Sequence, residues 1–255
     1  MYKLFVSEIR RHVRSRIFRW MMIAVSIGFN ILTGGAMKLG EIAFGKIHPT
    51  PEILFSMVPT IMPVLIGVYV IISESTEFSE GTIRNKLASG SRRGDILTAA
   101  VLSQAMCMVA ATTVFVLFSL ASGRILFGDF GITMNDIVAL SVVYLLACAA
   151  LTVFYTGIQF VIGNSRSVIV ISLVIALANQ TIAGELFRKL YPESGECVLS
   201  GIRFSMMSIY DRFIPFAYFT GPVRYDMWIY VIGAVLFSTV SFAVSSIIFE
   251  RTDIR

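Results

Sequence analysis

The chain has 255 residues, of which 56% are hydrophobic and only 15% are charged, and its formal net charge is +5. A soluble domain carries about 25% charged residues, so this composition excludes an ordinary soluble globule. The apolar residues fall into six long blocks without Asp, Glu, Lys, Arg or His, namely Trp20–Met37, Ile53–Ser73, Leu97–Ala121, Ile137–Ile162, Val168–Ala183 and Met227–Phe249. These blocks predict one all-α, polytopic membrane domain over residues 1–255 with six transmembrane helices, of which the fifth is the shortest.

Residues 1–19 predict an amphipathic helix on the membrane surface. An apolar stripe recurs at spacings of three and four, and arginines occupy much of the remainder. The stripe is Tyr2, Phe5, Ile9, Val13, Ile17 and Trp20, and the arginines are Arg10, Arg11, Arg14, Arg16 and Arg19. Two alternatives are flanking charges of the first span and a cleaved signal peptide. The long basic region and the lack of a small-x-small cleavage site argue against cleavage.

The distribution of Lys and Arg predicts the topology. Basic residues gather in 1–19, in the connection between the second and third blocks, and in the tail, whereas those on the opposite side are spread over longer loops. The positive-inside rule therefore predicts a multi-pass protein with both termini in the cytoplasm.

Prolines and amides inside the blocks are candidates for a gate or a transport pathway. Proline removes a backbone donor, so kinks are expected in the second helix, with or without a role in movement. The amide side chains are expected to hydrogen-bond between helices, and lining a pathway is the alternative. The candidates are Pro59, Pro63, Gln104, Gln159, Asn179 and Gln180.

The connection 73–96 carries a run of carboxylates and then a glycine. Glu74, Glu77 and Glu80 recur three apart, so they share one face if the second helix continues past the membrane. Gly81 can break that helix. The connection, expected as a cytoplasmic segment over 74–96, therefore begins with an acidic helical end.

A short separate helix is predicted after this break. Thr82 can cap its start and Gly90 can terminate it, after which Ser91 can cap the third transmembrane helix. Ile83 and Leu87 lie four apart and form one apolar face. If this face is exposed to water, it predicts a groove on a partner, and a solvated charged turn is the alternative.

Seven residues of this connection fit the pattern E-x-x-x-G-T-I-x-x-x-L-x-x-G-x-R. They are Glu77, Gly81, Thr82, Ile83, Leu87, Gly90 and Arg92. The pattern resembles the connection between the second and third helices of type-2 ABC transporter permeases, the drug, peptide and polysaccharide export family. The six spans, the basic amphipathic start and the chain length match that family's layout, although the motif itself covers only this connection.

The resemblance implies that the short helix is a coupling helix, docked in a groove of a separate ATP-binding cassette ATPase. The residues that would contact or orient the ATPase are Glu77, Glu80, Gly81, Thr82, Ile83, Arg84, Leu87, Gly90 and Arg92. ATP and magnesium would bind to the ATPase, and this chain would need no cofactor. A second permease chain, identical or similar, would complete an exporter of amphipathic peptides, drugs or lipid-like compounds, in a bacterial plasma membrane.

The segment 184–226 is predicted to be a long extracytoplasmic loop. It contains the apolar stretch Phe213–Phe219, and the family resemblance implies short re-entrant or interfacial helices here. Its aromatic residues and the nearby tryptophan suit the aromatic belt of a membrane interface; they are Tyr210, Phe216, Tyr218, Phe219, Tyr225 and Trp228. They either shape an exit gate or simply anchor the loop.

Motifs for enzymatic or metal chemistry are incomplete. Gly40–Lys46 resembles a P-loop, but Ile47 stands where Ser or Thr must bind magnesium, so no ATP hydrolysis by this chain is expected. The spacings of the histidines and cysteines form no metal-binding or disulfide motif. These residues are His12, His48, Cys107, Cys148 and Cys197. The first two cysteines are expected to pack inside spans, and Cys197 is expected to be a free thiol in the loop.

Two rival functions remain beside the exporter permease, and for none of the three is a nucleic-acid partner expected. One is a secondary transporter or channel that works without an ATPase, and the other is a non-transporting membrane scaffold or sensor partner. Proton-coupled transporters usually place a carboxylate or histidine within their spans, and the six blocks contain neither. An energy source outside the bilayer is therefore favoured.

Overall fold

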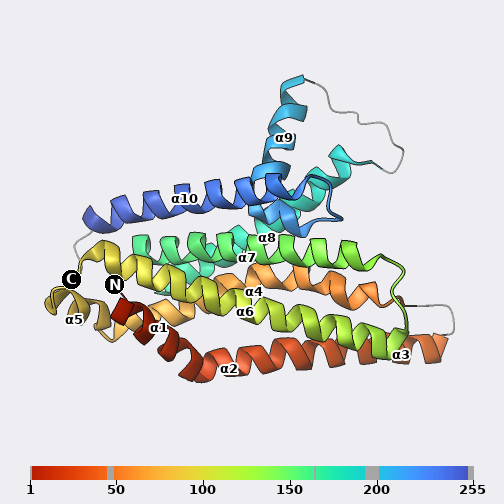
Figure 1. The fold of residues 1–255 in the computed structure, drawn as a ribbon, viewed down its shortest axis with the longest axis horizontal. Helices are drawn as coiled ribbons and strands as arrows, with labels where there is room; N and C mark the ends of the chain where they lie inside the picture. Colours follow the sequence, from red (N-terminus) through yellow and green to blue (C-terminus); the bar gives the residue numbers. More distant parts are fainter. Residues whose placement is uncertain (1, 45–48, 164, 193–200, 252–255) are drawn as a thin grey trace.

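The chain forms a bundle of long helices in a computed structural model that describes residues 2–44, 49–163, 165–192 and 201–251 (Figure 1). No strand occurs within these residues. Six helical segments are long and apolar enough to cross a membrane: Arg16–Ala43, Glu52–Ser79, Arg93–Phe127, Met134–Ile162, Ser167–Leu190 and Met227–Arg251. The prediction of an all-α, multi-pass membrane protein is confirmed. His48, Lys46, Ile47 and Cys197 lie outside the described residues.

The first span has an interruption that the sequence did not predict. It consists of α2 (Arg16–Ile23), the π-helical turn η1 (Ala24–Phe29) and α3 (Asn30–Phe44). The Asn30 side chain donates to the Ser26 carbonyl oxygen at 2.8 Å, within this turn. A π turn holds one more residue than an α turn, so it changes the rotational register between α2 and α3.

The centre of the bundle is made by α4 (Glu52–Ser79), α6 (Arg93–Phe127) and α7 (Met134–Ile162). Tyr69, Phe115 and Tyr155 are among the large side chains fully buried between them. The outer helices expose many apolar side chains, as expected for a surface that faces lipid rather than water. Cys107 and Cys148 are buried, which confirms their predicted packing role.

The flanking helices are α8 (Ser165–Leu190) and α10 (Met227–Arg251). The fifth predicted block covered only 168–183, yet α8 is a full-length helix because it continues through the polar residues up to Leu190. The start of α1 (Tyr2–Arg14) and the end of α10 lie at the same end of the bundle as α5 (Thr82–Ala88) (Figure 1). This is called the α5 end below.

Two short helices occupy the segment 184–226, where short helices were expected. The helix α9 (Gly201–Phe213) projects sideways from the bundle, and η2 (Pro215–Phe219) follows it (Figure 1). The expectation that all the aromatics here form an interfacial belt is wrong for Phe216, Tyr218 and Phe219, which are buried. Trp228 is exposed, as a belt residue should be.

Candidate functional site

The backbone around α5 defines a short, rigid helix. Gly81 separates α4 from α5. Its backbone is left-handed, at φ 68°, a conformation that favours glycine. Gly90, at φ 89°, ends α5 through two backbone bonds, from the Gly90 amide to the Leu87 carbonyl at 2.9 Å and from the Ser91 amide to the Lys86 carbonyl at 3.1 Å. This pattern is a Schellman motif. The prediction that Gly81 ends the preceding helix and that Gly90 terminates α5 is confirmed.

The predicted side-chain caps are wrong. Gly81 and Arg92 occupy the N-cap positions of α5 and α6 in place of Thr82 and Ser91, and neither makes a side-chain cap bond. Arg93 instead donates to the carbonyl oxygens of Phe249 at 2.9 Å and Glu250 at 3.1 Å, in the last turn of α10. A cation suits these otherwise unpaired carbonyls, and the contact joins α6 to α10 next to α5.

The apolar face of α5 packs on the chain's own bundle. Ile83 is 0% exposed and belongs to a hydrophobic cluster with Leu97, Phe160 and Phe249, and Leu87 lies at the edge of this cluster. The expectation of a water-exposed apolar face is therefore wrong, because α6, α7 and α10 cover it. The surface that α5 leaves exposed is polar and contains Arg84, Asn85 and the chain around Ser89.

The polar side of α5 enters a group of buried and partly buried charged and polar side chains, called the charged cluster. Its members come from four helices: Glu8, Arg11 and His12 of α1, Glu74 and Glu77 of α4, Lys86 of α5, and Gln104 of α6. Most charged residues are exposed unless they are paired, so this group requires mutual compensation.

Lys86 joins α5 to both α1 and α4. Its Nζ donates to the two carboxylate oxygens of Glu77 at 2.7 and 2.9 Å, and it also contacts Glu8. The side chains of Glu8 and Glu77 are 4% exposed. This is a nearly dehydrated ion pair, in which removal of one partner leaves buried charge behind.

Arg11 is the second cation of the charged cluster. It lies 2.8 Å from Glu8 and 3.2 Å from Glu74, and it forms a further ion pair with Glu77. Glu74 is fully buried and also accepts a hydrogen bond of 2.8 Å from Gln104 Nε2. The prediction that Glu74 and Glu77 share a helical face is confirmed, and this face points into the protein, whereas Glu80 is exposed.

His12 completes the charged cluster on its membrane side. It is 0% exposed, and its Nδ1 lies 3.0 Å from the Tyr69 hydroxyl and 3.2 Å from the Ser73 hydroxyl. Burial, with help from the nearby Arg11 and Lys86 charges, lowers the pKa of His12 to about 3. The imidazole is therefore neutral near pH 7.

This pKa predicts an acid-sensitive fold. The folded pKa lies below the ordinary value of 6.5, so the unfolded chain takes up a proton first and stability falls as the pH drops from 6.5 towards 3. Between pH 7 and pH 5, the wild type should lose about 2 kcal/mol of unfolding free energy relative to His12→Gln. Denaturant unfolding in mixed micelles at both pH values measures this, and parallel pH profiles of the two proteins would contradict it.

The amides predicted for the spans mostly connect helices. Gln180 Nε2 donates to the Thr60 carbonyl oxygen of α4 at 3.0 Å, and Asn179 accepts from the Tyr210 hydroxyl of α9 at 2.9 Å. Gln104 joins α6 to α4 through the charged cluster. Gln159 is buried in α7 and finds no hydrogen-bond partner within the described residues. Interhelical bonding is therefore confirmed for three of the four amides.

The two prolines of α4 are buried, and the helix continues through both. Pro63 has no amide hydrogen for the carbonyl four residues earlier, that of Pro59, so the helical hydrogen bonding of α4 is interrupted there. Gln180 of α8 donates to the next carbonyl, that of Thr60, and so connects α8 to α4 beside the interruption.

The chain matches no model of a known protein family, and no characterised protein matches its sequence at a significant level. The assignment of function therefore depends on the residues themselves.

A second buried ion pair lies in the segment 201–226 and was missed by sequence reasoning. Arg224 donates to Asp211 at 2.9 Å, and the Tyr225 hydroxyl donates to the same carboxylate at 2.7 Å. The Arg224 guanidinium also lies over the rings of Phe187 and Tyr191. These contacts fix α9 and the chain after η2 to the end of α8, which indicates a structural anchor.

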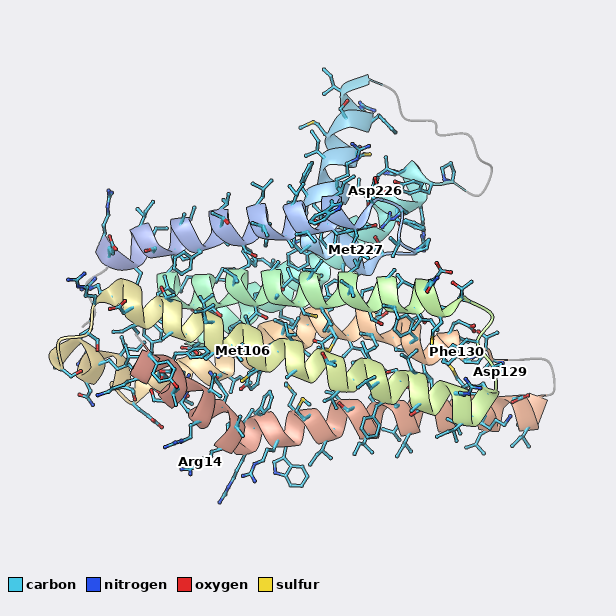
Figure 2. All side chains as sticks on the ribbon, viewed as in Figure 1. Arg14, Met106, Asp129, Phe130, Asp226 and Met227 are labelled. Atoms are coloured by element: carbon cyan, nitrogen blue, oxygen red, sulfur yellow. The ribbon has the colours of Figure 1, made fainter. Side chains whose placement is uncertain are left out.

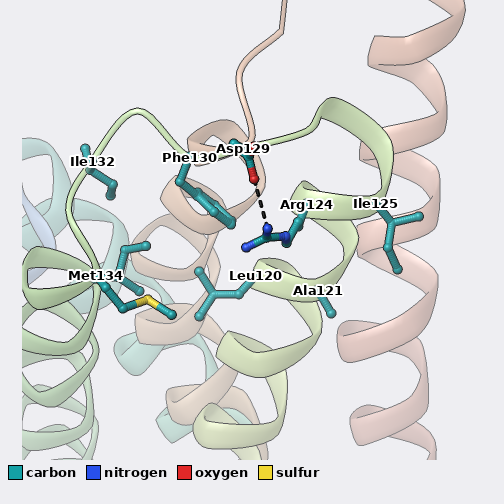
Figure 3. Close-up of a pocket in the computed structure, with 9 residues that line it drawn as sticks. Leu120, Ala121, Arg124, Ile125, Asp129, Phe130, Ile132 and Met134 are labelled. Carbon is teal, nitrogen blue, oxygen red and sulfur yellow. Dashed lines mark ion pairs between the residues drawn. The ribbon is translucent and has the colours of Figure 1, made fainter.

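A pocket of ≈ 590 Å³ lies between α6 and α7, at the end of the bundle opposite α5 (Figure 3). Its walls include Leu120, Phe130 and Met134, and an ion pair of 3.0 Å joins Arg124 to Asp129 at its edge. The nine residues that line it include none of the gate or pathway candidates.

Proposed function

We propose that this chain is the membrane-spanning permease subunit of an ATP-binding cassette exporter. The observation that carries the proposal is the way α5 is held. One side of α5 is exposed at the end of the bundle where α1 begins and α10 ends, and Lys86 binds its other side to α1 and α4. A protein bound to the exposed side would therefore act on two long helices at once.

The buried contacts explain why α5 would transmit force. A surface ion pair yields easily, whereas a dehydrated one resists separation because each charge would lose its partner in a low-dielectric site. Ile83 adds an apolar contact with α6, α7 and α10. Displacement of α5 would thus move the bundle by rigid-body shifts of helices rather than by bending one loop.

The sequence motif supports the identity of the partner. The pattern from Glu77 to Arg92 resembles the coupling segment of type-2 ABC permeases, whose ATPase binds ATP and magnesium on a separate chain. We infer that two permease chains assemble with two such ATPases in a bacterial plasma membrane, with α5 in the cytoplasm. An amphipathic substrate, leaving the cell, is the class that the resemblance favours.

Arg84→Glu tests the docking surface. Arg84 is exposed, so we expect an unchanged melting temperature and an affinity for the ATPase at least about tenfold weaker, measured by quantitative copurification from the native host. Leu87 should not be changed, because it packs in the hydrophobic cluster. Arg203→Glu, on the exposed surface of α9, is the matched control. Wild-type recovery of the ATPase with Arg84→Glu would contradict the docking assignment.

One observation favours a second candidate, a proton-coupled transporter without a motor. The predicted blocks contain no carboxylate, but α4 continues past Ser73 to Ser79 and carries Glu74 fully buried on a span helix. In the charged cluster, three carboxylates face only the two cations Arg11 and Lys86, so full ionisation leaves an excess negative charge. A buried carboxylate of this kind is typical of proton relays.

Proteoliposomes separate the two functions. Transport that requires ATP and the copurified ATPase, and that persists without a pH gradient, supports the permease. Transport driven by a pH gradient in the absence of any ATPase, and lost in Glu74→Gln, supports the motor-independent transporter.

A further inference from the structure

The segment formed by α1 and α2 is called the elbow. A helix on the surface of a soluble protein buries its apolar face and exposes its polar face, whereas the elbow does the opposite. The polar residues Glu8 and His12 are buried in the charged cluster. The apolar stripe points outward instead, and Trp20 is 69% exposed, with Val13 and Ile17 also exposed beside it. Such a face is stable only in contact with the acyl boundary of a membrane.

The outward side of the elbow is also strongly basic. Arg10, Arg14, Arg16 and Arg19 are exposed, and Arg14 points away from the bundle (Figure 2). The acidic residue of this segment, Glu8, is buried and already paired with Arg11 and Lys86. None of these four arginines forms an ion pair with another described residue, so their charge is uncompensated within the part of the chain that the structure describes.

We propose that the elbow binds anionic phospholipids of the leaflet at the α5 end, with lipid phosphates at Arg14, Arg16 and Arg19. Charge complementarity selects this occupant, because each basic residue near an anionic membrane surface strengthens binding by roughly fivefold. Ile17 and Trp20, interleaved with these arginines, lie in the acyl and headgroup region. A zwitterionic lipid would supply the apolar contact but no net countercharge.

The side of α1 that faces away from lipid contacts α5, so lipid binding also affects the position of α5. Glu8 and Arg11 hold Lys86 and Glu77, so the helix that contacts lipid on one face positions α5 with the other. Anionic lipid thereby stabilises the docked geometry of α5. This second step rests on the proposed permease function, whereas lipid binding itself does not.

Native mass spectrometry of the full chain in detergent micelles tests the site. Phosphatidylglycerol and phosphatidylcholine with identical acyl chains are titrated separately. The wild type is expected to prefer phosphatidylglycerol at least tenfold. The triple variant Arg14→Gln/Arg16→Gln/Arg19→Gln is expected to lose tenfold to a hundredfold in phosphatidylglycerol affinity, with phosphatidylcholine unaffected. Excess inorganic phosphate should not compete, which excludes a site for the free anion.

The matched control is Arg188→Gln/Arg203→Gln/Arg251→Gln, which removes the same charge from other exposed positions and should retain lipid preference. Equal loss in this control, or equal affinity of the wild type for both lipids, would overturn the proposal. Unchanged phosphatidylglycerol binding by the elbow variant would also overturn it, because the lipid would then bind elsewhere on the chain. If the elbow variant melts early, Arg14→Gln alone is used, with a fewfold loss expected.

Lipid binding by the elbow and the effect of lipid on α5 can be contradicted independently. Lipid selectivity is measured without any ATPase, so failure to recover an ATPase leaves this result standing. In vesicles of phosphatidylglycerol, an elbow variant that loses lipid selectivity and still binds the ATPase with wild-type affinity would overturn the link to α5 alone.

Discussion

Lys86→Met is expected to destabilise the protein by about 3–5 kcal/mol. The change keeps the length of the side chain but removes the ammonium that contacts Glu77 and Glu8, whose side chains are 4% exposed. Two carboxylates would then lose a shared countercharge inside the protein, and loss of one partner from a buried ion pair carries a cost of this size. The measurement is the free energy of unfolding in mixed micelles at pH 7.

Two controls decide whether the cost arises from stranded charge. Arg84→Met changes the exposed side of the same helix and should alter stability by less than about 0.5 kcal/mol. Adding Glu8→Gln and Glu77→Gln to Lys86→Met removes the stranded charges, and it should recover much of the loss. If Lys86→Met and Arg84→Met have the same free energy of unfolding, the charged cluster does not hold α5 in place.

Arg224→Met should have an effect of similar size, about 3–5 kcal/mol, on the opposite part of the protein. Asp211 is 2% exposed and would keep only its hydroxyl donors, Tyr225 and Tyr191. The stacking of the guanidinium on Phe187 and Tyr191 would be lost as well. We expect a lower melting temperature together with faster proteolysis of the segment 201–226.

Arg203→Met, on the exposed part of α9, should leave both measurements unchanged. The double variant Arg224→Met/Asp211→Asn should be more stable than Arg224→Met, because no buried charge remains. Proteolysis of Arg224→Met at the wild-type rate would show that the ion pair does not anchor this segment.

The sequence predicted the spans well because lipid imposes one simple requirement, the absence of unpaired charge. The same reasoning placed the end of the second block at Ser73, although α4 continues to Ser79. Glu74 and Glu77 are tolerated within that helix because Arg11 and Lys86 reach them from other helices. Arg11 is remote from Glu74 in sequence, and Lys86 belongs to a separate helix whose orientation depends on the tertiary fold, so local hydropathy contains no signal for either pairing.

Around α5, the sequence predicted the features that depend on the local backbone and missed those that depend on packing. Gly81 and Gly90 were identifiable because a left-handed conformation favours glycine. The burial of Ile83 was not, since the same spacing of apolar residues describes a face turned to a partner or to the chain's own bundle. Arg11 was indistinguishable from the flanking basic residues, because pairing with Glu74 requires the tertiary fold.

The π turn Ala24–Phe29 has a consequence for the two faces of the N-terminal segment. An α-helix turns by about 100° per residue. One additional residue in a turn therefore rotates the side chains of the preceding helix about its axis. Which side of α2 faces outward, relative to the exposed side of α3, is thus determined partly by a turn further along the same span. The first span therefore sets a fixed angular offset between its outer half and α2, which is joined through Ser15 to the helix that carries Glu8 and Arg11.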